Sequence, residues 1–168
     1  MSLVRPEPID TAQSRDAKAG LSFGAFEESV GFLLRIAQLT AFELMFEELG
    51  NRDLKIGEFT LLLAISENPG VRQGVMADVL KIKWSNMTKL VRSLEDRNLV
   101  ERHVPPHDRR AVELRLTADG RKLLDATAPA VFAADKRSLL MLTDMERRQL
   151  LNLLRKVAGW PTLVDRRP

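Results

Sequence analysis

Two short helical patterns separated by only three residues, and followed at once by a hairpin pattern, constrain the fold of this chain most strongly. The first pattern covers Gln73–Leu80, and the second runs from Trp84 to Asn98. In the second, apolar residues recur at steps of three and four, which is the spacing that places them on one face of a helix. These are Met87, Leu90, Val91 and Leu94. The spacing predicts a helix-turn-helix with Lys81-Ile82-Lys83 as its turn.

The residues after the second helix predict a β-hairpin. Leu99–Val104 is one candidate strand, and Ala111–Leu116, in which apolar and polar residues alternate, is the other. The prolines at the start of 105–110 stop regular structure, so we expect this segment to form the loop. A hairpin directly after a helix-turn-helix gives a winged helix-turn-helix.

The outer face of the second helix suits the major groove of DNA. A groove about 12 Å wide admits a helix only if the side chains on that face are not bulky. Short hydrogen-bonding residues lie there, followed by two cations that reach guanine edges or phosphates. They are Ser85, Asn86, Thr88, Lys89 and Arg92. The sequence therefore predicts that this helix binds DNA; the alternative is an ordinary amphipathic surface helix.

Positive charge is concentrated around these elements. Residues 72–122 hold twelve Lys/Arg and seven Asp/Glu, so this segment carries +5 while the whole chain carries +3. At the tip of the hairpin, Asp108 precedes Arg109 and Arg110. Two adjacent arginines repel each other in isolation and become favourable beside phosphates. We expect this tip to grip DNA; the alternative is a solvated basic face.

The remaining helical patterns frame the winged segment. They cover Phe26–Leu49, Ile56–Glu67, Ala118–Leu142 and 144–158. The first is apolar over more than one stripe, which indicates more than one packing partner. Thr117 is a predicted N-cap, Pro129 is expected to kink its helix, and Thr143 with Glu146 forms a capping box.

The segment "GVMADVLKIKWSNMTKLVRSLEDRNLVERHVPPHDRRAVELRLTADG" resembles the MarR family of bacterial transcriptional regulators. Its most specific parts are "SNMTKLVRSLEDRNLVER", "DRR" and "LTADG". The resemblance spans residues from about 30 to 158, counting the helix order. It implies a homodimer on a palindromic operator, with a recognition helix at Trp84–Asn98 and a wing at Leu99–Leu116. It also implies a dimerisation layer built from the first helix and the last two.

The chain departs from the family pattern at four positions. Lys83 stands where many relatives have serine, so the helix start is expected to rely on Ser85 or on water. Trp84 is large for a residue that faces a groove; it either packs on the wing or lines a pocket. Glu113 replaces a commonly basic wing residue. Asn98 stands in place of a common glycine, and we expect left-handed backbone angles there.

The resemblance also implies a small-molecule effector, often an aromatic acid or its thioester. Arg35, in a mostly apolar helix, is the residue that we predict as a carboxylate anchor; the alternative is that it extends to solvent. Phe59 and the apolar surface from Phe32 to Phe46 are candidate pocket walls, and a plain core is the alternative.

Other chemistry finds little support in the sequence. The chain has no cysteine, which excludes disulfides and thiol catalysis, and it has no phosphate-binding glycine loop. Its two histidines, His103 and His107, flank a diproline and lack further ligands, so no metal, cofactor or catalytic residue is expected. No apolar run is long enough to span a membrane, and no signal peptide opens the chain, so we expect a cytoplasmic protein.

Together these patterns predict a mainly α protein, with minor β structure, in which a winged helix-turn-helix lobe with a two-stranded wing is joined to an all-helical dimerisation layer. The expected division is a flexible arm (1–24), a dimerisation helix (25–54), the DNA-binding lobe (55–117), C-terminal dimerisation helices (118–160) and a polar tail (161–168). The expected function is that of a ligand-released homodimeric repressor. The alternative is a winged-helix protein-interaction module without sequence-specific DNA binding.

Overall fold

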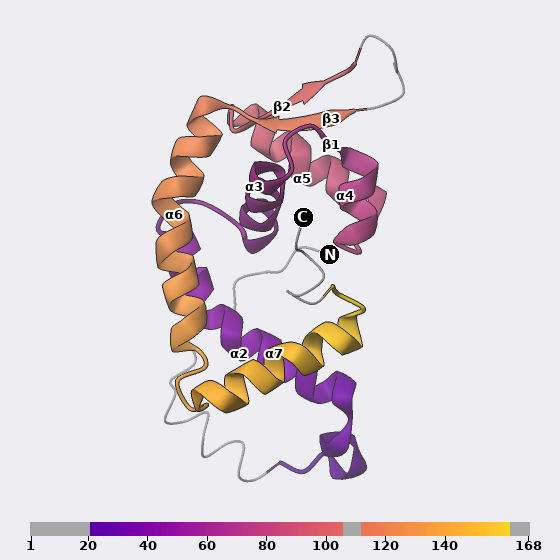
Figure 1. Cartoon of the computed structure of the whole chain (residues 1–168), viewed down its shortest axis with the longest axis vertical. Helices are drawn as coiled ribbons and strands as arrows, with labels where there is room; N and C mark the ends of the chain where they lie inside the picture. The colour runs from indigo at the N-terminus through magenta and orange to yellow at the C-terminus, as the bar shows by residue number, and fades with distance from the viewer. Residues whose placement is uncertain (1–20, 106–111, 162–168) are drawn as a thin grey trace. The chain divides into compact units, whose positions relative to one another are not determined.

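The computed structural model describes residues 21–105 and 112–161, and its elements follow the expected order (Figure 1). The chain divides into two compact units, with the boundary between Leu39 and Thr40 inside the first long helix. The fold class predicted from the sequence is confirmed: the structure is mostly helical with a small antiparallel sheet. The elements are a 3-10 helix η1 (Gly24–Glu28), α2 (Val30–Gly50), α3 (Ile56–Glu67), β1 (Val71–Arg72), α4 (Gln73–Val79), α5 (Trp84–Asp96), β2 (Val100–His103), β3 (Glu113–Leu116), α6 (Ala118–Arg137) and α7 (Asp144–Ala158).

The unit that ends at Leu39 contains η1 and the first half of α2. Three aromatic rings hold η1 against the helix: Phe32 has Phe23 at 5.4 Å and Phe26 at 5.1 Å between ring centroids. The remaining apolar side chains of this half of α2 are exposed. The large ones are Val30, Leu33, Leu34, Ile36 and Leu39.

Helix α3 is the centre of the unit that begins at Thr40. It contacts α5, α6 and β3, so its side chains are buried around most of the helix rather than along one stripe. The buried apolar residues of α3 are Phe59, Leu61, Leu62 and Ile65. Met87, Val91 and Leu94 complete this core from α5, as their spacing predicts.

The sheet has three strands in the order β1-β3-β2, and both pairs are antiparallel. Val100 pairs with Leu116 and His103 with Glu113, which gives the predicted two-stranded hairpin. Strand β1 was not predicted. It adds Val71, opposite Leu114, to the far edge of β3.

Helix α6 begins as predicted and ends early. The Thr117 hydroxyl accepts a hydrogen bond from the Gly120 N–H at 3.0 Å, which caps the start. The predicted end at Leu142 is wrong, because α6 stops at Arg137. After Arg137 the backbone bonds become three-residue turns, and the Ser138 hydroxyl donates to the Asp135 carbonyl. The helix continues through Pro129, so the kink stays a prediction.

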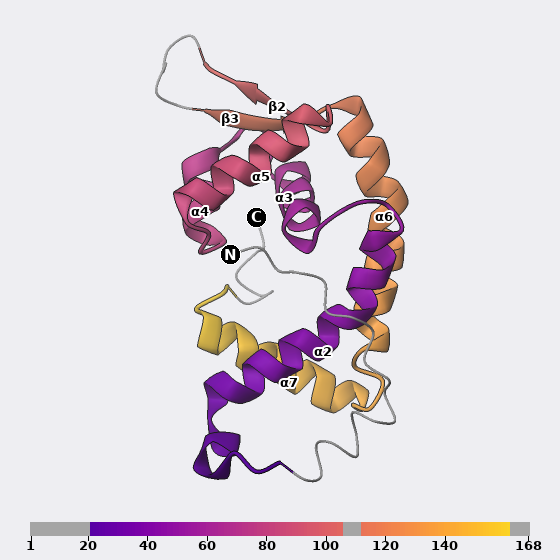
Figure 2. The same cartoon turned by 180° about the vertical axis from the view of Figure 1, so that it is seen from behind.

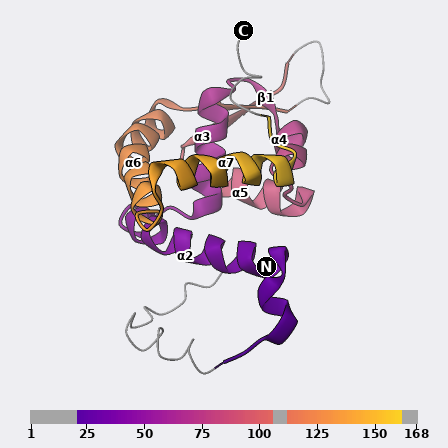
Figure 3. The ribbon, with the colours of Figure 1, turned by 60° about the horizontal axis from the view of Figure 1, so that its bottom comes forward.

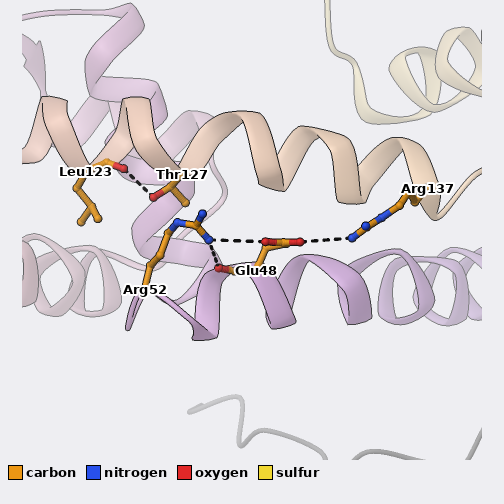
Figure 4. A network of polar contacts seen from close by, with 5 residues as sticks. All are labelled: Glu48, Arg52, Leu123, Thr127 and Arg137. Carbon is orange, nitrogen blue, oxygen red and sulfur yellow. Dashed lines mark hydrogen bonds and ion pairs between the residues drawn. The ribbon is translucent and has the colours of Figure 1, made fainter.

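Polar contacts tie α6 to the end of α2 (Figure 4). The Glu48 carboxylate lies between the guanidinium groups of Arg137, at 3.4 Å, and Arg52, at 3.6 Å. Arg52 also donates to the Glu48 carbonyl at 2.8 Å. On the buried side of α6, the Thr127 hydroxyl donates a hydrogen bond to the Leu123 carbonyl at 2.6 Å.

Helix α7 follows α6 after a turn (Figure 3). The predicted capping box is confirmed: the Thr143 hydroxyl accepts from the Glu146 N–H, and the Glu146 carboxylate accepts from the Thr143 N–H. Gly159 ends the helix in a left-handed conformation. None of the helices among the described residues combines the length and the apolar character needed to cross a membrane.

Candidate nucleic-acid interface

Helices α4 and α5 form the helix-turn-helix that the sequence predicts, and Figure 2 shows them side by side below the hairpin. The turn is tight: Lys81 takes a positive φ of 55°, and the Ile82 N–H bonds to the Ala77 carbonyl at 2.9 Å. Met76 and Ala77 of α4 are buried against the core that also receives α5. The orientation of α5 is therefore fixed by packing on its inner side, which leaves its outer side to solvent.

The predicted site residues of α5 lie on that outer side. Ser85, Asn86, Lys89 and Arg92 are exposed. Arg92 lies 4.0 Å from the Asp96 carboxylate, but both side chains are mostly exposed, so solvent weakens this pair and the guanidinium can exchange it for another anion. The structure thus groups these four side chains on one accessible helix face.

Thr88 differs from the other four because its hydroxyl is already engaged. It donates to the Trp84 carbonyl at 3.0 Å and accepts from the Gln73 side chain at 3.4 Å. Gln73 itself is buried and begins α4. Since a hydroxyl has a single hydrogen to donate, Thr88 has none left for a base. Its side chain instead joins the starts of the two helices.

Trp84 is the first residue of α5, and 58 % of its surface is exposed. Its neighbour is α4: a Cβ built on Gly74 would lie 3.8 Å from Cζ3 of the indole ring. The sequence predicted packing on the wing or a place in a pocket. The structure places the ring on the open surface beside α4.

The end of α5 is locked to the start of α6. Asn98 takes a positive φ of 55°, which confirms the left-handed conformation expected there. Its side-chain amide donates to the Asp119 carboxylate at 2.9 Å, and its carbonyl accepts from the Thr117 hydroxyl at 2.7 Å. The end of α5, the start of β2 and the start of α6 are therefore linked through Asn98.

The described part of the wing contains both positively and negatively charged side chains, and they form ion pairs. Arg102 of β2 pairs with Glu95 of α5 at 3.0 Å, which ties the wing to α5. Glu113, the unusual acidic residue of β3, pairs with Arg115 at 3.3 Å. Asp108, Arg109 and Arg110, the predicted residues of the wing tip, lie outside the described residues.

Sequence reasoning missed a buried carboxylate behind α5. Glu58 is 2 % exposed, and its oxygens accept from the Lys55 N–H at 3.0 Å and the Ser93 hydroxyl at 2.7 Å. The Arg97 guanidinium lies 3.5 Å away. A glutamate inside the apolar run of α3 was the available signal, because such a group is buried only when it is hydrogen-bonded.

The two residues predicted to bind a ligand fall in different units. Arg35 is exposed on α2 in the unit that ends at Leu39. Phe59 is 3 % exposed in the core of the other unit, where its ring meets Phe132 edge-on at 6.3 Å. The core contact accounts for the position of Phe59. Within residues 21–105 and 112–161, no group of three or more side chains could hold a metal ion.

Known proteins resemble the chain across the helix-turn-helix and beyond it. The model of the MarR family matches residues 52–111. A putative transcriptional regulatory protein for the hcr operon of Thauera aromatica is 31% identical over 140 residues, which are 83% of this chain and 84% of that protein.

Two solved structures extend the likeness to the fold. The transcriptional repressor CouR, bound to a 23-mer DNA duplex, has 32% identity and a TM-score of 0.76; the match covers 82% of this chain and 98% of CouR. Bordetella bronchiseptica BpsR, whose DNA binding is regulated by 6-hydroxynicotinic acid, has 25% identity and a TM-score of 0.75 over 84% of this chain and all of BpsR. Sequence, fold and helix-turn-helix agree, and the chain belongs to the MarR family of transcriptional regulators.

Proposed function

We propose that this regulator is a homodimeric repressor that binds a palindromic operator with α5 in the major groove. The observation that carries the proposal is the grouping of Ser85, Asn86, Lys89 and Arg92 on the exposed face of α5. Short polar side chains and cations on such a face suit base edges and phosphates. The likeness to a repressor in complex with DNA supports the same geometry.

Each part of the chain has a separate role in this proposal. Residues 55–117 read DNA, and Asp108, Arg109 and Arg110 at the wing tip add a sequence-tolerant grip on the backbone. The helices of 25–54 and 118–160 join two copies. Because its target is the chromosome, the regulator is proposed to act in the cytoplasm.

The interaction-module alternative is not favoured. A winged helix that has stopped binding DNA has no need for exposed cations on the recognition helix, yet Lys89 and Arg92 are both exposed here. The relatives that match the chain are transcriptional regulators, and one is a repressor bound to DNA.

DNA binding can be tested by fluorescence anisotropy on labelled promoter fragments at several salt concentrations. We expect Lys89→Ala and Arg92→Ala to cost about 1–3 kcal/mol each, unevenly across sequences, because their targets are bases or nearby phosphates. Arg110→Ala should weaken binding evenly and lower the salt slope by about 1. Lys136→Ala, which removes an exposed cation at the far end of α6, is the matched control. Binding that does not weaken as salt rises would contradict the proposal.

We further propose that a small aromatic acid or its thioester releases the repressor, with Arg35, exposed on the first half of α2, as the carboxylate anchor. The regulation of BpsR by 6-hydroxynicotinic acid supports the ligand class. A ligand of this kind acts by preferring a conformation that does not fit the operator.

The probe for this part is 6-hydroxynicotinic acid, titrated into the preformed protein–DNA complex, with benzoyl-coenzyme A as a thioester probe. Release of DNA by either compound, and its loss in Arg35→Ala, is the expected result. Release that persists unchanged in Arg35→Ala would remove Arg35 from the site without affecting the assignment of α5.

A further inference from the structure

Trp84 has no role in the functions proposed so far, although it stands at the start of the recognition helix. A single exposed apolar residue is ordinary on a protein surface, so its exposure alone decides nothing. Its position in the helix points to a role, because the N-terminal residues of a recognition helix are those that contact base edges. Trp84 is the first residue of α5.

The structure places the ring beside α4 and fixes the backbone beneath it. Gly74 of α4 carries no side chain, and the indole edge occupies the space next to it. The Trp84 carbonyl accepts the Thr88 hydroxyl one helical turn later, and Thr88 in turn accepts from the buried Gln73. The backbone under the indole is therefore fixed to α4, while more than half of the residue's surface faces solvent.

On the side of α5 that Trp84 occupies, the next side chain along the helix adds apolar rather than polar surface. On a helix with 3.6 residues per turn, Thr88 lies on the same side as Trp84. Since the Thr88 hydroxyl is engaged within the protein, its methyl group and the indole ring are what this side offers to DNA. Within the major groove, the apolar group that a base presents is the C5-methyl of thymine.

We propose that Trp84 is a specificity-determining residue, whose indole ring packs on the C5-methyl group of one thymine in each half-site. The inference rests on the proposed operator binding by α5. The contact that it assigns to Trp84 is apolar, unlike the contacts of Lys89 and Arg92, so its strength should not depend on the salt concentration. A ring that instead stacks on a deoxyribose would contribute affinity without selecting a base.

The experiment begins by selecting binding duplexes from a random library with the wild-type protein. Each thymine of the selected half-site is then replaced in turn by deoxyuridine, which removes only the methyl group. At one position we expect the wild-type protein to lose about fourfold in affinity, the equivalent of one buried methyl group. Trp84→Ala should show no loss at that position, and Trp84→Phe should keep it.

Val79→Ala is the matched control, because it removes another exposed apolar side chain from the same lobe. It should keep the full deoxyuridine effect. The salt slope of Trp84→Ala should equal that of the wild type, since no charge is lost. Should Trp84→Ala fail to fold, Trp84→Gln takes its place, with folding checked by circular dichroism.

The fluorescence of the Trp84 indole gives a second measure of its contact with DNA, without changing Trp84 itself. The chain has two tryptophans, Trp84 and Trp160, so a Trp160→Phe background leaves one emitter. The affinity of this variant for the selected duplex is measured first. We expect its emission to change on adding the selected duplex, and to be less accessible to acrylamide in the complex.

The outcomes separate this inference from the function on which it rests. If no duplex is selected, the proposed operator binding fails. If duplexes are selected but Trp84→Ala keeps the deoxyuridine effect, or no thymine shows one, the role of Trp84 is overturned and operator binding stands. An equal loss on all duplexes in Trp84→Ala would identify sugar stacking and overturn the inference as well.

Discussion

Gly120 lies where the first turn of α6 passes the chain that leaves α5. A Cβ atom at this position would lie 1.9 Å from the Leu99 carbonyl oxygen, and that oxygen belongs to the backbone. Neither α6 nor the root of the wing can move without disturbing the other. We expect Gly120→Ala to lower the free energy of unfolding by about 3 kcal/mol or more. Urea denaturation followed by circular dichroism measures the change.

Gly57 provides the control for this substitution. It also lies in the first turn of a helix, α3, and a Cβ there would meet only the Leu90 methyl groups, at 3.5 and 3.6 Å. Because alanine favours helix more than glycine does, Gly57→Ala should leave stability unchanged or raise it by up to about 1 kcal/mol. If the two variants were equally stable, the close approach at Gly120 would not be a constraint.

The buried Glu58 makes a second prediction for a single residue. Glu58→Ala leaves the Lys55 N–H and the Ser93 hydroxyl without their acceptor, so we expect a loss of about 2–3 kcal/mol in the free energy of unfolding. Glu58→Gln keeps one acceptor and should lose about 1 kcal/mol. In a double-mutant cycle with Ser93→Ala, the losses should be less than additive; strict additivity would mean that the two groups do not interact.

These residues also show where sequence reasoning works. The outer face of α5 could be predicted because helical periodicity alone separates Met87 and Val91 from Ser85 and Lys89. The burial of Glu58 and the internal hydrogen bonds of the Thr88 hydroxyl could not be predicted in this way. Each depends on a partner in another element, 35 residues away for Ser93 and 15 for Gln73, and periodicity carries no information about such partners.

At the scale of elements, local chemistry predicted helix starts better than helix ends. Thr117 and Thr143 were recognised as N-caps because the cap and its partner lie within three residues. The end of α6 at Arg137 was missed because no glycine marks it. Strand β1 was missed for another reason: Val71 and Arg72 are too few to show alternation, and their pairing depends on β3.

The capping box of α7 gives a pH-dependent prediction. The Thr143 backbone N–H, followed by its hydroxyl, lowers the pKa of Glu146 from its ordinary value of 4.5. A carboxylate with a lowered pKa in the folded state stabilises the fold above pH 4.5, and the contribution is lost as the pH falls through the lowered pKa. The difference in melting temperature between wild type and Glu146→Gln should therefore shrink below pH 4.5.

Thr143→Ala tests the same capping box by changing the residue that hydrogen-bonds to Glu146. It removes the hydroxyl and keeps the backbone N–H, so the pH-dependent difference should become smaller without vanishing. Thermal melts followed by circular dichroism between pH 7 and pH 3 provide the comparison. A difference that stays constant over this range would show that Glu146 does not stabilise the start of α7.

For the whole molecule, the sequence patterns could not say which surface meets which partner. Apolar residues at helical spacing look alike whether they face the chain's own core or a second copy. Residues on α3 with this pattern are buried in one chain, while several on α7 remain exposed: Leu151, Leu153 and Val157. Exposure in the folded chain is what distinguishes a core from an interface, and it requires the structure.

Leu153 and Val157 lie about one turn apart on α7, Trp160 follows just after the helix, and Leu153 is 60 % exposed. If this stripe joins two copies, Leu153→Glu places a charge in an apolar interface, and the protein should become monomeric in light scattering after size-exclusion chromatography. Asn152→Glu adds the same charge beside the stripe and should leave the dimer intact.

The same variant connects assembly to DNA binding. Two recognition helices in one dimer engage both half-sites together, so a monomer should bind the full operator roughly 10²-fold more weakly or worse. Its affinity for a single half-site should change little, because α5 and its charges are untouched. A Leu153→Glu protein that is monomeric and still binds the full operator as the wild type does would show that α7 assembles copies without organising them on DNA.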